Sequence, residues 1–189
     1  MISNYIKTFS DILSNTKITD QTGKVLSEEM AFSNIIEQFK NVQKSGKTVF
    51  LIGNGGSSGI VSHSSIDFMN ACMIKAFPIT DNSQITCFAN DYGYENVYRK
   101  PLEIMFQEGD ALIAVSSSGS SKNIVNASQT ASEKGGFVLT LSGFKKENLL
   151  RKSGHINFWI DVEDYGIVEI GHALLLHIIT DELQKHTKK

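Results

Sequence analysis

From Thr48 onward, short runs of β-forming residues alternate with stretches of helical character, and this alternation constrains the fold most strongly. The β-rich runs are TVFLI, QITCF, ALIAVS, FVLTLS and INFWI. The intervening sequence predicts helices at about 57–70, 96–107, 121–134 and 167–185. Such an order is typical of a parallel sheet covered by helices on both faces. We therefore expect an α/β three-layer sandwich with a mainly parallel sheet flanked by helices.

The segment before this region predicts two amphipathic helices. Apolar residues recur at helical spacing from Tyr5 to Leu13 and again from Phe32 to Phe39. The intervening KITDQTGK is expected to be a turn-rich connector. With 189 residues and 41% hydrophobic content, the chain can bury one continuous core. We expect one domain over 1–189, with a helical extension at 1–45 and an α/β core at 46–189.

Charge and cysteine content exclude several classes of partner. The formal net charge of −2 provides no broad cationic field for nucleic acid or for an anionic membrane. Cys72 and Cys87 lack the spacing of a metal or redox motif, so we expect buried free thiols. The first residues lack an uninterrupted apolar stretch, and no apolar run is long enough to cross a bilayer. A cytoplasmic location is the expectation.

The first candidate site is the loop that follows TVFLI and reads Gly53-Asn54-Gly55-Gly56-Ser57-Ser58. Glycines allow close approach of the backbone to an anion, and a helix start offers unpaired N–H groups and the positive end of its dipole. The pattern is neither the dinucleotide GxGxxG nor a P-loop. A tight connection between strand and helix would use the same glycines, and this alternative stays open.

A second loop of similar character follows ALIAV. It reads Ser116-Ser117-Ser118-Gly119-Ser120-Ser121 and again precedes a helical stretch. Hydroxyl groups and backbone amides at a helix start can together donate hydrogen bonds to phosphate oxygens. Ser120 or Ser121 could also serve simply as a helix cap. Because ligands in open α/β sheets bind beyond the carboxyl ends of the strands, the two loops together predict an anion site.

Two predicted helices carry groups that could move a proton. His63 and Asp67 lie four residues apart and therefore share a helix face. The last helix adds Glu169, His172 and His177. Each also has an ordinary structural interpretation: a histidine within ALLLHII can be a hydrogen-bonded core residue, Asp67 a salt-bridge partner and Glu169 a solvated helix residue.

The order of these motifs is similar to that of the SIS (sugar isomerase) family, and most similar to the phosphoheptose isomerases. The resemblance rests on GNGGSS, NDYG at 90–93, SSSGSS, EKG and a late helix with histidines, and it covers nearly the whole chain. It implies that the two loops hold the phosphate of a sugar, with Asn54 and Asp91 lining the sugar. The substrate-binding residues so implied are Asn54, Gly55, Gly56, Ser57, Asp91, Ser116, Ser117, Ser118 and Ser121.

The resemblance also implies a catalytic set of Asp67, Glu169 and His177. His63 and His177 match the family pattern, whereas Asp67 stands where the family has glutamate and Glu169 where it has glutamine. The shorter Asp67 side chain withdraws its carboxylate by about 1.5 Å, so either Asp67 or Glu169 is expected to act as the base. Family members can bind zinc through these positions, which makes His63, Asp67, Glu169 and His177 the expected zinc ligands.

What the resemblance implies for function is the aldose–ketose isomerisation of a sugar phosphate through an enediol. Sedoheptulose 7-phosphate and D-glycero-D-manno-heptose 7-phosphate are the expected pair, for the heptose units of a lipopolysaccharide or capsule. The expected assembly is a homotetramer. Only Lys75 falls in NACMIKAFPI, where typical phosphoheptose isomerases carry arginine, so another sugar phosphate stays an alternative. A sugar-phosphate-binding or partner-scaffolding protein without catalysis is the alternative from another class.

Overall fold

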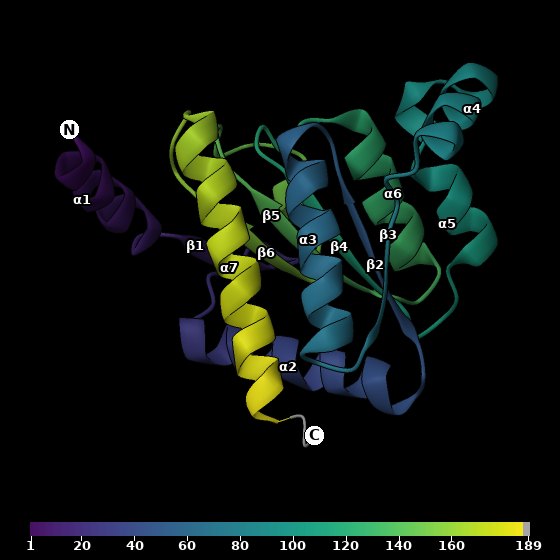
Figure 1. Cartoon of the computed structure of the whole chain (residues 1–189), viewed down its shortest axis with the longest axis horizontal. Helices are drawn as coiled ribbons and strands as arrows, with labels where there is room; N and C mark the ends of the chain where they lie inside the picture. Colours follow the sequence, from purple (N-terminus) through teal and green to yellow (C-terminus); the bar gives the residue numbers. More distant parts are fainter. Residues whose placement is uncertain (187–189) are drawn as a thin grey trace.

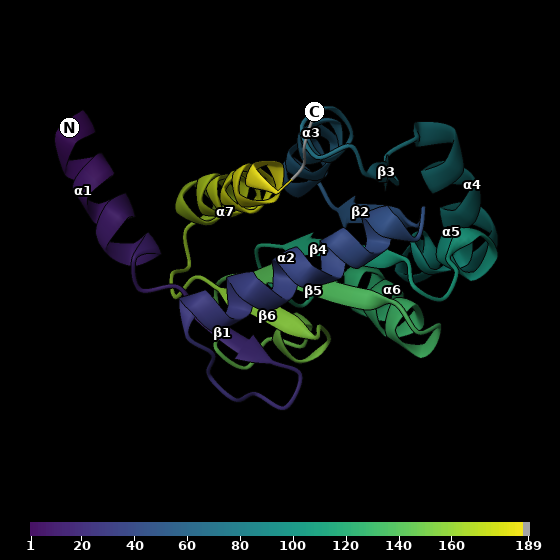
Figure 2. The same cartoon turned by 90° about the horizontal axis from the view of Figure 1, so that it is seen from below.

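The computed structural model describes residues 1–186 and contains one six-stranded sheet with helices on both sides (Figures 1 and 2). In chain order the elements are α1 (Ile2–Leu13), β1 (Lys17–Asp20), α2 (Glu28–Lys44), β2 (Thr48–Gly53), α3 (Gly56–Asn70), β3 (Lys75–Pro78), α4 (Asn82–Tyr92), the 3₁₀ helix η1 (Tyr94–Asn96), α5 (Arg99–Met105), β4 (Ala111–Ser116), α6 (Lys122–Glu133), β5 (Phe137–Ser142), the 3₁₀ helix η2 (Leu150–Lys152), β6 (Ile156–Trp159) and α7 (Tyr165–Lys185).

The strand order is β1-β6-β5-β4-β2-β3, and every pair is parallel except β1 with β6. Successive strand residues point to opposite faces. Val49 and Leu51 therefore join the core under α2, α3 and α7, whereas Phe50 and Ile52 join the core under α5 and α6. The structure confirms the predicted α/β class with a mainly parallel sheet between two helical layers, and the two leading helices are present.

One predicted strand is a helix. QITCF lies inside α4. The strand that pairs with β2 at this edge of the sheet is β3 (Lys75–Pro78), which precedes α4. The Asp81 side chain caps α4 by accepting a hydrogen bond from the Gln84 amide at 2.9 Å. Ile85, Phe88 and Ala89 then pack against the core at helical spacing. Cys87, expected to be buried, is exposed on this helix, whereas Cys72 is buried.

The connector between the two leading helices also differs from the prediction. Lys17–Asp20 forms β1, the antiparallel edge strand paired with β6. The following turn is held by Asp20, whose Oδ1 accepts from the Thr22 amide at 2.8 Å and the Lys24 amide at 3.1 Å. The segment 1–45 is therefore not purely helical, because it completes the sheet. The extent of the domain stays a prediction.

In the part of the chain that the structure describes, no helix combines the length and apolar character needed to span a membrane.

Candidate active site

The first loop turns sharply between β2 and α3. Gly55 adopts φ 53° and ψ −122°, which a residue with a side chain rarely tolerates. At Gly53 an added Cβ would lie 2.8 Å from the Ser57 backbone, so only glycine permits this close approach. The loop therefore leads straight into the first turn of α3, where backbone N–H groups lack helical partners.

The second loop leaves β4 and enters α6 in a similar way. Gly119 has φ 61°, and its carbonyl accepts a hydrogen bond from the Leu150 amide at 2.9 Å. The Gly119 amide donates to Ser116 Oγ at 3.2 Å, and the Ser116 and Ser121 hydroxyls lie 3.4 Å apart. Ser121 is the first flanking residue of α6, but its side chain makes no capping hydrogen bond. Its hydroxyl is therefore not committed to a helix cap.

The two loops meet in one small pocket. Because β2 and β4 are parallel neighbours, their carboxyl ends emerge side by side. The pocket has a volume of about 130 Å³. Its lining residues are Asn54, Ser57, Ser116, Ser117, Ser118, Ser121, Tyr165 and Glu169. Among the described residues, the buried Ser117 Oγ has no hydrogen-bond partner. A buried hydroxyl without a partner is costly, and a bound oxygen ligand would satisfy it.

The Glu169 carboxylate also faces this pocket. It lies directly over Gly56, where any added Cβ would overlap its oxygens. Within residues 1–186 the carboxylate makes no hydrogen bond or ion pair, and the residue is half-buried. The absence of a side chain at Gly56 thus makes room for a carboxylate beside the start of α3, a position that the N-terminal end of the helix dipole stabilises.

A second group of reactive side chains lies between α3 and α7. Asp67 Oδ2 is 3.6 Å from His63 Nε2 and 3.5 Å from His177 Nδ1. The two imidazole rings are 5.3 Å apart between centroids. His63 and His177 also line an open hollow with Gly56, Gly59, Ile60, Ser64 and Ala173. Gly56 thus belongs to this hollow while it contacts Glu169 of the serine pocket, so the two regions adjoin.

The four predicted metal ligands do not all come together. His63, Asp67 and His177 can each offer one ligand atom, and these atoms lie within 4.8 Å of one another. Glu169 is absent from that group and instead lies with the serines. Imidazole nitrogens and a carboxylate oxygen suit zinc, and three protein ligands leave a position open. The donor set therefore fits zinc.

Asp91 and Gly55 are predicted site residues that line neither region. Asp91 lies near the end of α4, is exposed, and accepts a hydrogen bond from Asn90 Nδ2 at 2.8 Å. Gly55 is the turn residue before α3 and does not line the serine pocket.

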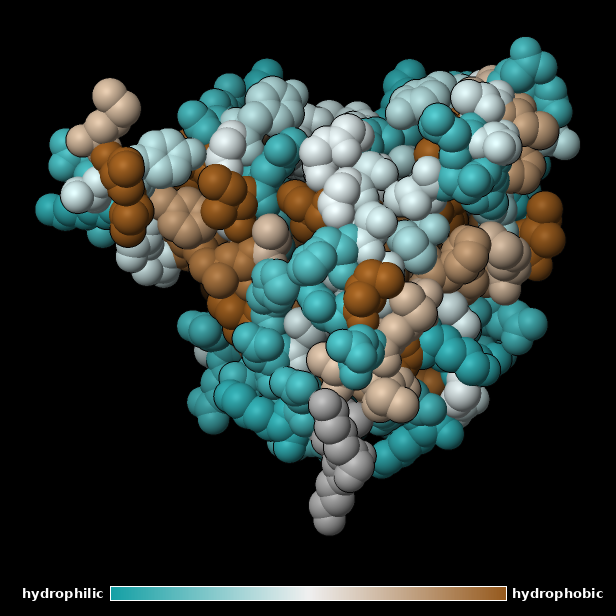
Figure 3. All heavy atoms as spheres, in the orientation of Figure 1, coloured by the Kyte–Doolittle hydropathy of each residue, from teal (hydrophilic) through white to brown (hydrophobic). Residues whose placement is uncertain are grey.

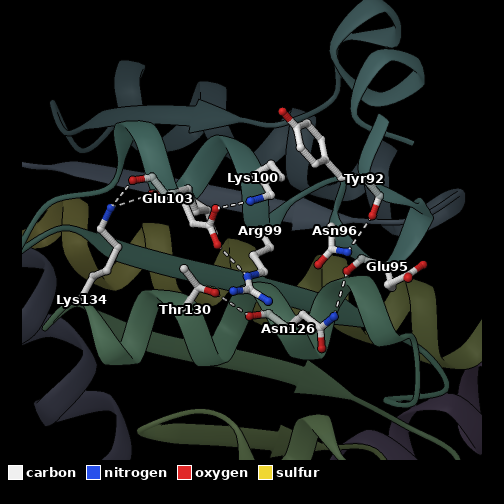
Figure 4. Close-up of polar contacts among 10 residues, drawn as sticks. Tyr92, Glu95, Asn96, Arg99, Lys100, Glu103, Asn126, Thr130 and Lys134 are labelled. Carbon is white, nitrogen blue, oxygen red and sulfur yellow. Dashed lines mark hydrogen bonds and ion pairs between the residues drawn. The ribbon is translucent and has the colours of Figure 1, made fainter. Parts of the chain in front are cut away.

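The segment after α4 is fixed to α6 by several polar contacts (Figure 4). Asn126 Nδ2 donates to the Glu95 carbonyl at 3.0 Å. Lys134 Nζ donates to the Leu102 and Glu103 carbonyls at 3.1 Å and 2.6 Å. The Asn126 contact therefore holds η1 beside the first half of α6, and the Lys134 contacts hold α5 at the end of α6.

Sequence reasoning missed two asparagines that support the loops. Asn148 is buried, and its Nδ2 donates to the Gly143 and Lys145 carbonyls while its Oδ1 accepts from the Arg151 amide. Asn123, in the first turn of α6, pairs with the Asn54 side chain. Neither had a local signal, because an asparagine in a turn or early in a helix is ordinary in sequence.

His172 is completely buried beside the Ser142 backbone, and its two nitrogens have no hydrogen-bond partner among the described residues. Burial lowers its pKa from 6.5 to about 4, although the Ser142 backbone partly opposes the shift. The unfolded chain therefore binds more protons between these pH values. The contribution of His172 to the free energy of unfolding should be fully present above pH 6.5 and should be lost as the pH decreases toward 4.

We therefore predict that His172→Leu flattens this pH dependence. Between pH 7 and 4.5 protonation of the unfolded-state histidine should lower the free energy of unfolding by about 2–3 kcal/mol, since each unit of pKa difference corresponds to about 1.4 kcal/mol. Leucine has no proton to bind, and it leaves no polar atom unsatisfied. Urea denaturation of both proteins at several pH values measures the free energy of unfolding. An unchanged pH dependence in the variant would assign the titration to other groups.

Comparison with known proteins agrees with this architecture. The family model described as "SIS domain" matches residues 5–143. The phosphoheptose isomerase of Geotalea daltonii is 30% identical over 188 residues, which cover 93% of each chain. A phosphoheptose isomerase structure from Francisella tularensis superimposes with a TM-score of 0.82, at 21% identity, over 97% of this chain and 96% of the other.

A second solved structure shares the fold as well. The Vibrio vulnificus NanR protein, solved in complex with ManNAc-6P, superimposes with a TM-score of 0.66 at 17% identity. The match covers 96% of this chain and 59% of that protein. At this identity the likeness concerns the fold alone, whereas the relatives at 30% identity and the matching family model define the relationship. The chain belongs to the SIS domain family and, within it, to the phosphoheptose isomerases.

Proposed function

We propose that this chain interconverts sedoheptulose 7-phosphate and D-glycero-D-manno-heptose 7-phosphate. The observation that carries the proposal is that the two serine loops share one pocket, which adjoins the cluster of His63, Asp67 and His177. Relatives at about 30% identity carry the name phosphoheptose isomerase. A phosphate-binding pocket beside a carboxylate and imidazoles is what aldose–ketose isomerisation requires.

The phosphate is proposed to bind between the starts of α3 and α6. Ser57, Ser116, Ser118 and Ser121 supply hydroxyl donors, and the backbone amides of both helix starts add further donors. The unsatisfied Ser117 Oγ supports an oxygen ligand at this place. Gly55 and Gly56 contribute through the backbone conformation that they allow.

The reacting carbons lie far from the phosphate in a heptose 7-phosphate. An extended chain of single bonds of about 1.5 Å places C1 roughly 10 Å from phosphorus. A rise of about 1.5 Å per residue separates Ser57 from His63 by roughly 9 Å along α3. With its phosphate among the serines, the sugar is therefore long enough for C1 and C2 to reach the cluster of His63, Asp67 and His177.

In the proposed proton transfer, the Asp67 carboxylate removes the proton from C2 of the aldose to form an enediol and returns it to C1 of the ketose. His177 exchanges the protons of the two oxygens. Asp67 lies 3.5 Å from His177, so both groups can reach adjacent atoms of one substrate. Glu169 is the second carboxylate of the site, and its role as a base stays a prediction.

A bound zinc ion would be held by His63, Asp67 and His177, which would leave one coordination position open. Zinc supplies a Lewis acid that polarises a carbonyl oxygen. An Asp67 oxygen that binds metal is not available as a base. Turnover measured after chelation and after addition of zinc distinguishes these two uses of Asp67.

Glu169 should weaken phosphate binding, because it places a negative charge in the serine pocket. We predict that Glu169→Gln tightens the binding of inorganic phosphate. Removal of a repulsion of about 1–2 kcal/mol corresponds to a roughly five- to thirtyfold lower Kd. Isothermal titration calorimetry measures the effect, with Glu163→Gln, an exposed carboxylate before α7, as the control. Equal or weaker binding in Glu169→Gln would place the anion elsewhere.

A non-catalytic sugar-phosphate-binding protein is the second candidate function. The substitutions at Asp67 and Glu169 favour it, and the fold also occurs in the NanR protein, which was solved in complex with ManNAc-6P. The two functions differ in the exchange of substrate hydrogen. An isomerase should introduce solvent deuterium at C1 of the ketose, whereas a binding protein should retain the original hydrogen.

The proposed function is tested by turnover of a panel of heptose, hexose and pentose phosphates, with and without zinc. We expect aldose–ketose interconversion with the heptose phosphate as the preferred substrate. No turnover of any member under either condition would reject an isomerase. Preference for a hexose or pentose phosphate would reassign the substrate. The heptose pathway and the cytoplasmic location stay predictions.

A homotetramer is the proposed assembly. Every residue of α1 is exposed or half-buried, and Ile2, Tyr5 and Ile6 present large apolar side chains. Ile170 and Leu174 on α7 are also exposed. Figure 3 shows apolar side chains gathered where α1 approaches the first half of α7. Such a surface favours burial against another subunit.

We predict a tetrameric mass by light scattering and a smaller species for Ile6→Glu, since a buried charge opposes the contact. Lys7→Glu, a change of charge at the next residue of α1, is the control for a general effect of charge. A monomeric mass for the unaltered protein at working concentration would contradict the assembly.

A further inference from the structure

The side-chain amide of Asn54 has a defined orientation because of its neighbour Asn123. Asn123 Oδ1 accepts from the Ile124 amide at 3.0 Å, which fixes its oxygen. Asn123 Nδ2 donates to Asn54 Oδ1 at 2.9 Å, and Asn54 Nδ2 donates back to Asn123 Oδ1 at 3.0 Å. A rotated Asn54 amide would set oxygen against oxygen and nitrogen against nitrogen. The positions of oxygen and nitrogen in Asn54 are therefore determined by the network.

Two tyrosine hydroxyls, those of Tyr94 and Tyr98, lie near Asn54 Oδ1, but only one of them donates its proton to this oxygen. Tyr98 Oη lies 3.1 Å from this oxygen and 2.6 Å from the Gly53 carbonyl. A hydroxyl has one proton, and the shorter, buried contact with Gly53 takes it. Burial also raises the pKa of Tyr98, so the proton is retained. The Tyr94 hydroxyl, 3.2 Å from Asn54 Oδ1, is then the donor to the second lone pair.

One N–H of the Asn54 side-chain amide remains without a hydrogen-bond partner among the described residues. The amide oxygen has two lone pairs, which accept from Asn123 and Tyr94, and one N–H donates to Asn123. The second N–H has no partner among the described residues, and Asn54 lines the serine pocket. Asn54 therefore offers a donor, and not an acceptor, to a molecule bound there.

We propose that Tyr94 is a positioning residue that holds Asn54 as an N–H donor to an oxygen of the bound sugar phosphate. The inference rests on the proposed function, since it names how that same pocket recognises its ligand. Tyr94 is 54% exposed, yet it is placed accurately because η1 is tied to α6 through Asn126 and the Glu95 carbonyl at 3.0 Å. An oriented donor loses less entropy on binding than a free amide.

A double-mutant cycle tests whether Tyr94 acts through Asn54. Sedoheptulose 7-phosphate binding is measured by calorimetry for the unaltered protein, Tyr94→Phe, Asn54→Ala and the double variant. Tyr94→Phe should raise Kd about three- to tenfold in the unaltered background, the effect of one hydrogen bond. In the Asn54→Ala background the same change should have no effect, because the amide that Tyr94 orients is gone.

Asn54→Asp tests the polarity of the contact. A carboxylate offers only acceptors and also adds a negative charge to the pocket, so this variant should bind sedoheptulose 7-phosphate more weakly than Asn54→Ala, by about tenfold or more. Thermal unfolding of each variant shows whether the fold is retained.

The matched control is Tyr92→Phe. The Tyr92 ring lies beside Lys100, whose Nζ is 5.0 Å from the ring centroid (Figure 4). The Tyr92 hydroxyl has no partner in the described chain, so binding should not change.

The possible failures are distinguishable. If Tyr94→Phe weakens binding equally in both backgrounds, or has no effect in the unaltered one, the positioning role is rejected and the proposed function stands. If Asn54→Asp binds as tightly as the unaltered protein, the donor assignment is rejected. If the unaltered protein does not bind sedoheptulose 7-phosphate, the proposed function fails and this inference fails with it.

Discussion

Replacement of Asp67 with asparagine is expected to reduce isomerase turnover by about 100- to 10,000-fold, the range for loss of a general base. Asp67 is the carboxylate that faces both imidazoles, at 3.6 Å from His63 and 3.5 Å from His177. Asparagine keeps the size of the side chain but cannot accept the substrate proton. Steady-state kinetics should show that the loss lies in kcat, while the Kd for sugar phosphate stays within about threefold, since the phosphate donors are untouched.

Asp181→Asn is the control, because Asp181 is an exposed carboxylate on α7 outside the cluster. It should retain the turnover of the unaltered protein. If Asp67→Asn also retains turnover and Glu169→Gln loses it, the base is Glu169. If neither variant loses turnover, the proposed proton transfer is wrong.

The second large effect is expected for Gly119→Ala in the second serine loop. Gly119 has φ 61°, and an added Cβ would overlap the buried Asn148 side chain. The left-handed backbone and the overlap together should cost about 2–4 kcal/mol of folding free energy. Asn148 holds the turn after β5 through its hydrogen bonds, so it cannot move aside easily. The second serine loop should therefore shift and bind phosphate more weakly. Calorimetry with inorganic phosphate and urea denaturation measure both effects.

Gly59→Ala is the matched control. Gly59 is an exposed residue inside α3 with open space at its Cβ position, so alanine should stabilise the protein by about 0.5–1 kcal/mol. Phosphate binding should not change. Normal phosphate binding in Gly119→Ala would show that the conformation of the second loop is not required for the site.

Local sequence pattern predicted most of the sheet, but two errors show its limits. Ile85, Thr86, Cys87 and Phe88 favour a strand by composition, yet the Asp81 cap and the spacing of Ile85, Phe88 and Ala89 favour the observed helix. β1 lies inside a turn-rich connector because its stability comes from pairing with β6, which is far away in the sequence. A strand that depends on such a partner has no strong local signature.

The candidate site was likewise predicted only in part from the sequence. Glycines and serines after two neighbouring strands indicated the pocket, because parallel strands bring their carboxyl ends together. Helical spacing placed His63 and Asp67 on one face, and their contact with His177 follows from the packing of α3 on α7. The sequence did not indicate that Glu169 would lie with the serines or that the Tyr94 hydroxyl would contact Asn54, because both contacts depend on tertiary packing.

The most direct test of the central claim is a crystal structure of the protein soaked with sedoheptulose 7-phosphate. The phosphorus should lie between the starts of α3 and α6, within hydrogen-bond distance of the Ser57, Ser116, Ser118 and Ser121 hydroxyls. C1 and C2 should then approach the Asp67 carboxylate and the His177 ring. A phosphate bound elsewhere, or a sugar chain directed away from Asp67 and His177, would contradict the proposed active site.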